Sequence, residues 1–235
     1  MADNYNGSYA ELVTDIAKNV ELVFEAGQKS EYDRFWDAFQ DYGNRTNYVG
    51  AFKDYWNEET FKPKYDLKPT GLYAGQMFQN NPIKDFKGHL EKCGVKLDTS
   101  ECTSLLQMFQ SSKAQYIPII DARKANNNTS YAFSPDTIIS IEKLIVSEQT
   151  IYGIYMIDSA NLENIIFEGT IANNGLKLSN CKKLSHESLM SIKRALKNGV
   201  SGLTVTFSTK HKEDGKLTDS DIAEISAKGW SVAFQ

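Results

Sequence analysis

A four-letter motif, QMFQ, occurs twice in this chain, and its recurrence restricts the fold more than any other feature. It stands in GQMFQNN at residues 75–81 and in LQMFQSS at residues 106–112, which places Phe78 and Phe109 31 positions apart. Two further large apolar residues, Phe133 and Met156, follow at intervals of 24 and 23 positions. Recurrence at intervals of this size is typical of folds built from stacked copies of one small unit.

A short apolar run follows each of these four residues and predicts one β-strand per unit. The runs cover residues 95–97, 117–119, 144–146 and 165–167. Units of about 20–29 residues with one strand each have the period of leucine-rich repeats. Because one unit cannot bury its apolar side alone, we expect a short solenoid with a parallel strand ladder.

The alignment of the units also predicts which side chains are equivalent. Phe78 and Phe109 should fill matching positions of adjacent coils, with the small polar residues beside them in turns. Leucine is scarce and the period is loose, so chance repetition is the alternative. The neighbouring rungs of one ladder should carry Leu97, Ile119, Ile145 and Ile166.

The first unit is longer than the others, and a helix accounts for the difference. Apolar residues recur there at helical spacing and are followed by Gly94, a residue suited to end a helix. The helical positions are Ile83, Phe86, Leu90 and Cys93.

Aromatic residues at helical spacing precede the repeats and predict a helical N-terminal cap over residues 30–64. The first predicted helix ends at Gly43. The second begins after residues 44–47, a stretch suited to N-capping. Their aromatic faces contain Tyr32, Phe35, Trp36, Phe39 and Tyr42, then Tyr48, Phe52, Tyr55 and Trp56. Such stripes usually belong to a core.

Residues 1–29 contain an apolar seam whose steps alternate between four and three, the spacing of a coiled coil. β-branched residues at both seam positions favour trimers, so we expect an attachment or oligomerisation helix. A terminal helix packed on its own domain is the other interpretation, because the seam spans fewer than three heptads. The seam residues are Tyr9, Val13, Ile16, Val20 and Val23.

The segment 181–235 follows the repeats of residues 65–180 and predicts an αβαβ C-terminal cap. Ser185 is placed to cap a helix ending at Gly199, and residues 203–207 alternate as a half-buried strand. Thr218-x-x-Asp221 is similar to a capping box and begins a second helix, which Gly229 ends before a closing strand at 230–234.

Composition excludes several classes of partner. The net charge of −4 gives no electrostatic footprint for nucleic acid, and no apolar run approaches the roughly 20 residues that cross a bilayer. The first residues carry neither the basic nor the apolar part of a secretory signal, so we expect synthesis in the cytoplasm. Cys93, Cys102 and Cys181 have unrelated spacings and are expected to be reduced and mostly buried.

The sequence offers no constellation of catalytic residues. No nucleotide-binding glycine loop, nucleophile elbow or HxxxH pair is present. Of the three histidines, His89 is expected on the outer side of its helix, His186 in the first turn of a capped helix and His211 in a polar loop. We therefore expect no enzyme, and no catalytic, cofactor or metal site.

Several stretches together resemble a known group of proteins. They are EYDRFWDAFQDYGNRTNYVGAF, FKPKYDL, the MF and AF pairs at the turns, LSHESLMSIKRAL and the final GW. From about Gly27 onward the chain looks like leucine-rich-repeat proteins encoded among tail and baseplate genes of phages and prophages of Gram-positive bacteria. The repeats are similar to the divergent class of bacterial surface antigens, in which Ala-Phe marks each coil. Ala132-Phe133 fits this pattern, whereas Met77-Phe78 and Met108-Phe109 depart at the first residue.

The resemblance implies a virion structural protein, such as a fibre or receptor-binding module of the tail or baseplate. It implies attachment to other virion proteins, and assembly as a homotrimer, through the N-terminal helix. A host-surface glycan or protein is the expected receptor, because exposed tyrosine and tryptophan provide flat stacking faces. The alternatives are a bacterial leucine-rich-repeat adhesin or interaction module outside a virion, and a small hydrolase.

Overall fold

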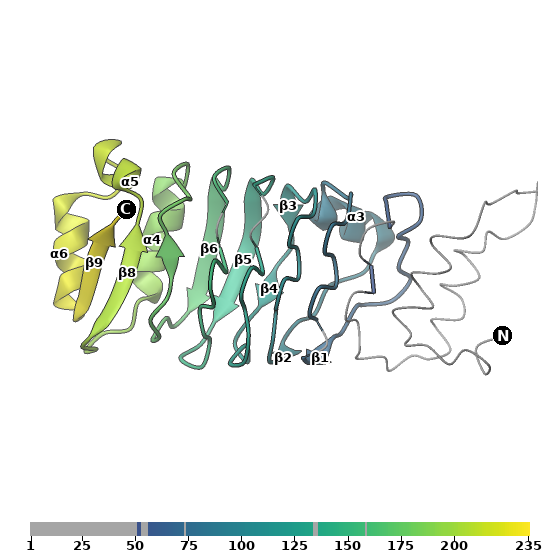
Figure 1. Ribbon diagram of the computed structural model, residues 1–235, viewed down its shortest axis with the longest axis horizontal. Coiled ribbons are helices and arrows are strands. Elements are labelled where there is room, and N and C mark those ends of the chain that lie inside the picture. Colours follow the sequence, from purple (N-terminus) through teal and green to yellow (C-terminus); the bar gives the residue numbers. More distant parts are fainter. Residues whose placement is uncertain (1–50, 53–55, 73, 134–135, 158) are drawn as a thin grey trace, which may run out of the picture.

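The computed structural model describes residues 51–52, 56–72, 74–133, 136–157 and 159–235, which form an α/β structure with parallel strands. In chain order the elements are β1 (Thr70–Gly71), α3 (Phe86–Cys93), β2 (Glu101–Cys102), β3 (Tyr116–Ile117), β4 (Ile120–Asp121), β5 (Ser140–Val146), β6 (Asn164–Gly169), β7 (Lys177–Leu178), α4 (His186–Ala195), β8 (Leu203–Phe207), α5 (Thr209–Glu213), α6 (Asp219–Ala227) and β9 (Trp230–Phe234). Successive coils are arranged along the long axis of the molecule, from α3 toward α6 and β9 (Figure 1).

The described strands form three parallel sheets. Strands β1 and β2 pair, β5 lies between β6 and the two short strands β3 and β4, and β8 lies between β7 and β9. In the central sheet, Ile117 pairs with Ile141 and Ile141 with Ile165, so equivalent residues are 24 positions apart. Leu67 and Leu97 form an isolated parallel bridge before this sheet.

The predicted strand register is wrong, although the strands are parallel. Leu144 pairs with Ile120 and not with Ile117, because the coils repeat after 24 residues and the predicted alignment placed these runs 27 apart. Ile119 does not pair with Ile145; it lies between β3 and β4 and is 39% exposed. Ile145 instead pairs with Asp121 and Glu168.

The structure explains why QMFQ occurs twice. The rings of Phe78 and Phe109 stack with centroids 5.1 Å apart, and Phe133 stacks on Phe109 at 6.2 Å. Phe52 extends the stack at the other end, 5.9 Å from Phe78. The predicted equivalence of Phe78 and Phe109 is thus confirmed. The fourth position is Ile157, which pairs with Phe133, and not the neighbouring Met156.

Backbone bonds join these turns, and an equivalent residue of each turn has a left-handed conformation. The N–H of Gln76 donates to Leu106 O at 2.8 Å, that of Gln107 to Ser130 O at 2.9 Å, and that of Tyr131 to Ile154 O at 3.0 Å. Gln76 and Gln107 also join their side chains, with Nε2 donating to Oε1 at 2.7 Å. The equivalent left-handed residues are Gln76, Gln107, Tyr131 and Tyr155, with φ between 50° and 56°; Asn80 and Ser111, in the first two turns, are also left-handed, with φ of 57°.

The helix expected in the first unit is confirmed as α3. Asp85 caps its N-terminus by accepting from Gly88 N, and Gly94 ends it in the left-handed conformation. Ile83 lies before the helix and is buried. The helix buries Phe86 and Leu90.

The helices and strands predicted for residues 181–235 are present, with two differences. Ser185 caps α4, and Thr218 and Asp221 form the predicted capping box of α6. α4 ends at Ala195, four residues earlier than expected, because Leu196 is extended and pairs with Ile171. The short helix α5 was not predicted.

Helix α4 occupies the place of a further strand beside β6. Ser188 Oγ accepts from Ile165 N at 3.0 Å, and Ser191 Oγ accepts from Phe167 N at 3.1 Å. These serines provide hydrogen-bond acceptors for two backbone N–H groups on the free edge of β6.

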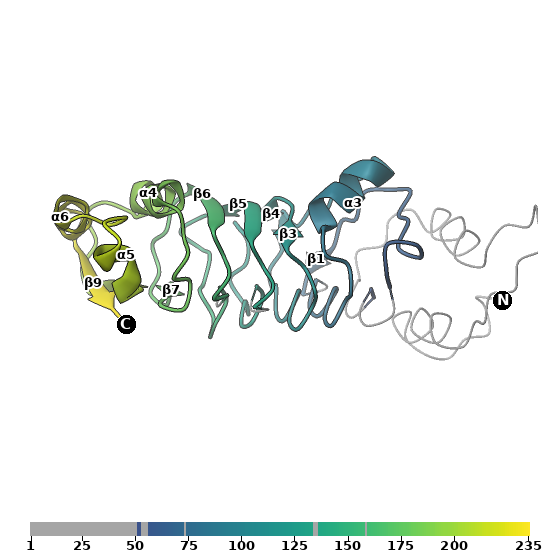
Figure 2. The same cartoon turned by 90° about the horizontal axis from the view of Figure 1, so that it is seen from above.

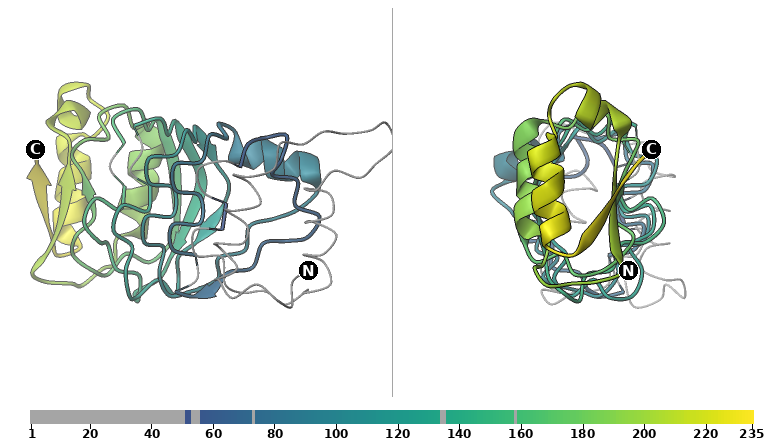
Figure 3. Two further views of the ribbon diagram at one scale, coloured as in Figure 1. Left: turned by 45° about the vertical axis from the view of Figure 1, so that its right-hand side comes forward. Right: turned by 90° about the vertical axis from the view of Figure 1, so that its left-hand side faces the viewer.

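Figure 2 shows α3, α4 and α6 on the same side of the molecule as β5 and β6. Viewed along the long axis, α4 and α6 lie opposite β8 and β9 (Figure 3).

The two N-terminal predictions fall largely outside the described residues. The seam of Tyr9, Val13, Ile16, Val20 and Val23 does so entirely, as does the first aromatic helix of the cap. Of the second aromatic helix, Phe52 and Trp56 are described. Both are buried and pack edge to face at 5.5 Å, as expected for a hydrophobic core.

Candidate interaction surfaces

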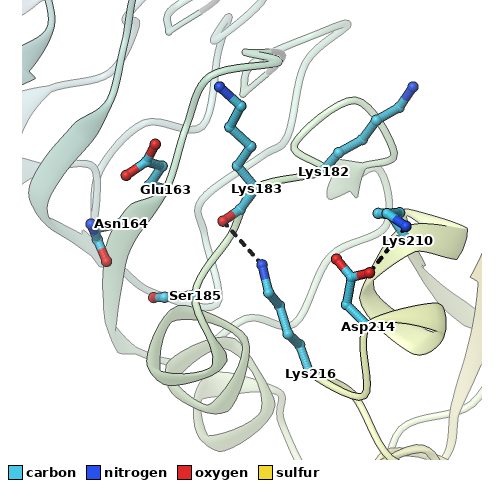
Figure 4. Close-up of a pocket in the computed structure, with 8 residues that line it drawn as sticks. All are labelled: Glu163, Asn164, Lys182, Lys183, Ser185, Lys210, Asp214 and Lys216. Carbon is cyan, nitrogen blue, oxygen red and sulfur yellow. Dashed lines mark hydrogen bonds and ion pairs between the residues drawn. The ribbon is translucent and has the colours of Figure 1, made fainter.

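An open cleft of about 580 Å³ lies where β6 begins and α4 and α5 approach each other (Figure 4). The N-cap residue Ser185 stands at its base, and the segment after α5 forms one wall. The side chains around it are polar or charged. They belong to Glu163, Asn164, Lys182, Lys183, Ser185, Lys210, Asp214 and Lys216.

Four lysines and two carboxylates give this cleft an excess of positive charge. Lys210 forms an ion pair with Asp214 at 3.0 Å, and hydrogen bonding to that carboxylate raises the pKa of Lys210. Lys216 Nζ donates to Lys183 O at 3.4 Å, while Lys183 Nζ donates to Asn161 Oδ1 at 2.8 Å. Most of these ammonium groups are therefore held by local partners.

Ser185 in the cleft and His186 next to it in sequence are engaged in hydrogen bonds within the fold. Ser185 Oγ lies 2.9 Å from Ser188 Oγ and accepts from Ser188 N. His186 directs Nδ1 to Lys216 O at 2.9 Å. Throughout the part of the chain that the structure describes, no three His, Cys, Asp or Glu side chains gather in a group that could hold a metal ion.

The structure corrects two of the three histidine predictions. His89 is buried against Phe61, whose ring it stacks on and whose carbonyl it contacts, and does not lie on an outer helix side. His211 lies in α5, fully buried, with Nε2 2.8 Å from Cys181 O, and not in a polar loop. Burial lowers the pKa of His211. His186 begins α4, as predicted.

The expectation of mostly buried cysteines is confirmed. Cys102 and Cys181 are buried, and Cys93 is half-buried. Burial raises the pKa of Cys102 to about 12, so its thiol is protonated at neutral pH.

Two groups of exposed apolar side chains lie away from the cleft. Tyr116 and Ile119, 41% and 39% exposed, lie in and beside β3; we call this region the sheet face. Ile154 and Tyr155, 65% and 47% exposed, lie in the last of the stacked turns. Sequence reasoning had not located either group.

Helices that could cross a membrane are absent from the described residues. No family model, no curated protein and no solved structure matches the chain. The functional proposal therefore rests on the residues, their geometry and the family resemblance.

Proposed function

We propose that this chain is a phage virion structural protein, an appendage of the tail or baseplate that contacts other proteins or a host surface. Residues 65–180 would be a leucine-rich-repeat solenoid, with a helical cap at 30–64 and an αβαβ cap at 181–235. Residues 1–29 would attach the module and join three copies. Such a role needs neither a cofactor nor a catalytic centre.

The observation that carries the proposal is the regular stacking of equivalent residues. The rings of Phe52, Phe78, Phe109 and Phe133 form one row, and the parallel pairs of the central sheet have offsets of 24 residues, or 23 after a register shift in the pairing of β5 with β6. Stacked repeats give a rigid, elongated body with long exposed surfaces, which suits a spacer that presents a binding face. The resemblance to tail-associated repeat proteins supplies the virion context.

The C-terminal elements also support the proposal. Open sheet edges invite pairing with other chains, and here α4 covers the edge of β6 with two serine hydroxyls. A capped end keeps a repeat protein soluble while it is displayed at high local density.

The first test is the oligomeric state of the full chain. Light scattering should give about three times the 26.4 kDa of one chain, and the double change Ile16→Asp and Val20→Asp on the predicted seam should reduce this to one. Lys18→Asp, between the seam positions, is the control and should leave the trimer intact. A monomer at every concentration would contradict assembly through the seam.

The second test asks whether the chain is part of a particle. Mass spectrometry of purified virions should detect it in constant ratio to other tail proteins, and electron cryomicroscopy should place its density on the tail or baseplate. Recovery of the chain in a cell-envelope fraction, with none in particles, would favour the alternative of a bacterial adhesin or interaction module.

A further inference from the structure

The stacked turns form one row of side chains across four coils, which we call the turn ridge. Its members are the left-handed residues Gln76, Gln107, Tyr131 and Tyr155, one from each turn. Backbone bonds of 2.8 to 3.0 Å fix each turn against the next. Since adjacent parallel segments lie about 4.8 Å apart, the row is about 15 Å long.

The turn ridge lies in segments that contain no charged residue. Residues 74–83, 102–112, 125–133 and 149–157 have no Asp, Glu, Lys, Arg or His, although charged residues make up 24% of the chain. Lys or Glu residues stand just outside these segments, at Lys84, Glu101, Lys113, Lys124 and Glu148. Many residues of these segments are buried, but the exposed ones, such as Asn80, Ser111, Asn127 and Tyr155, are uncharged too. A solvated surface normally carries charge, so an uncharged surface along four stacked turns indicates another role.

The side chains of the ridge combine amides with phenol rings. Gln76 and Gln107 are bonded amide to amide, and the rings of Tyr131 and Tyr155 lie with their centroids 5.7 Å apart. Ile154, at 65% exposure, extends the apolar area beside Tyr155. Tyrosine with small polar and amide residues is the composition of antibody binding surfaces, because tyrosine contributes contact area at low entropic cost.

The four residues of the turn ridge have an energetically unfavourable backbone conformation. A left-handed φ at a residue with a side chain costs about 1–2 kcal/mol in general, and it is found here at all four positions of the ridge. Strain of this kind persists where surrounding structure enforces it, and it often marks functional surfaces. Here it fixes the direction of four side chains in advance of any ligand.

We infer that the turn ridge binds an uncharged glycan chain. A sugar ring has an apolar C–H face that stacks on a phenol ring, and hydroxyls at its rim that exchange hydrogen bonds with amides. The lack of charge disfavours an anionic polymer, because the ridge offers no cation to pair with it. The inference rests on the proposed function, since it supplies the surface with which the module would contact a host.

The test uses the full chain and a panel of neutral hexamers of hexose and N-acetylhexosamine, with sulfated and uronate hexamers as the charged arm. At least one neutral hexamer should bind. Tyr155→Ala should weaken that binding about tenfold, the effect expected for one lost stacking partner. Tyr155→Phe, which keeps the ring, should remain within about twofold.

Tyr116→Ala on the sheet face is the matched control and should leave binding unchanged. Thermal unfolding of each variant checks that Tyr155→Ala is folded. Binding of charged hexamers alone, binding of no hexamer, or loss of binding in Tyr116→Ala but not in Tyr155→Ala would each overturn the inference. A protein or a second copy bound at the ridge would overturn it as well.

The two proposals fail separately. If the full chain is trimeric and present in virions but no neutral hexamer binds, the glycan site is wrong and the appendage stands. If a neutral hexamer binds through Tyr155 but the chain is absent from particles, the site stands and the virion role is wrong.

Discussion

Two serine hydroxyls bind the outer edge of the central sheet, at β6. Ser188 and Ser191 lie on the face of α4 toward β6 and accept hydrogen bonds that a neighbouring strand would otherwise accept. Serine is a weak helix former, so its use at two buried positions of one helix has a local cost. The benefit is that two buried backbone N–H groups are satisfied.

We expect Ser188→Ala and Ser191→Ala each to lower the free energy of unfolding by about 1–3 kcal/mol, because each leaves a buried N–H without an acceptor. Chemical denaturation of the purified chain measures this. Ser226→Ala, at an exposed position of α6, is the control and should change stability by no more than about 0.5 kcal/mol. Equal effects at all three serines would contradict the edge-capping role.

An ion pair between α4 and α6 gives a prediction of pH dependence. Asp221 accepts from Lys193 Nζ at 2.7 Å and from Thr218 Oγ1 at 2.6 Å. Burial alone would raise the pKa of Asp221, but these hydrogen bonds together outweigh it and lower the pKa to about 2. The contribution of Asp221 to stability is therefore complete above its ordinary pKa of 3.8 and is lost as pH falls toward 2.

Asp221→Asn should accordingly lower the free energy of unfolding by about 1–2 kcal/mol at pH 7, and its difference from the parent should shrink below pH 4. Denaturation at a series of pH values tests this. Asp219→Asn, an exposed position of the same helix, should show neither effect. A difference that stays constant down to pH 2 would exclude the ion pair as its source.

The surroundings of single residues were harder to predict from the sequence than the helices and strands. The N-caps Ser185 and Thr218 were found because their hydrogen bonds are local. His89 was expected on the outer side of its helix because it is not one of the apolar positions of that helix, and His211 in a loop because its neighbours in sequence are polar. Contacts with Phe61 and Cys181, 28 and 30 positions away, bury them. Local composition carries no information on such contacts.

At the scale of elements, close approach of backbones limits substitution. Gly229, with φ +94°, follows α6 just before β9, and an added Cβ there would collide with Val200 O of the preceding coil. Gly215 also has positive φ, but an added Cβ there would meet no atom within 4 Å.

Gly229→Ala should therefore destabilise the chain by at least about 3 kcal/mol, the sum of a left-handed conformation and overpacking. Gly215→Ala should cost only about 1–2 kcal/mol, from the conformation alone. Thermal and chemical unfolding of the two variants measures the difference. Equal destabilisation of the two variants would mean that the close approach of Val200 to Gly229 does not affect the free energy of unfolding.

Element types were largely predictable and their register was not. Helical spacing and capping residues identified α3, α4 and α6, and alternation identified β8. The register depends on the 24-residue offset between coils, and apolar residues in β3, β4 and β5 allow more than one alignment. Among the candidate surfaces, the turn ridge had a signal in the sequence, namely the segments without charged residues. The sequence did not show that these segments lie side by side, because that depends on the stacking of the turns.

At the scale of the whole molecule, the strands among the described residues pair only with segments one coil away. Phe109→Ala should remove about 3–5 kcal/mol of stability, because it opens a cavity in the aromatic row between Phe78 and Phe133. In a structure with contacts only between neighbours, the loss should stay local.

Hydrogen exchange followed by mass spectrometry should show faster exchange of Phe109→Ala around residues 74–133, with β8 and β9 protected as in the parent chain. Ile154→Ala, at an exposed side chain, is the control and should leave exchange in the core unchanged. Uniform loss of protection along the chain would indicate one cooperative unit instead.

The pairs that join β3 to β5, and β5 to the start of β6, have an offset of 24 residues, and all three strands run in the same direction. An in-frame tandem duplication of one such unit would insert a strand into the sheet while both ends kept their present neighbours. The gene can therefore lengthen or shorten the molecule in steps of about 4.8 Å by recombination between its own repeats, without redesign of either terminus.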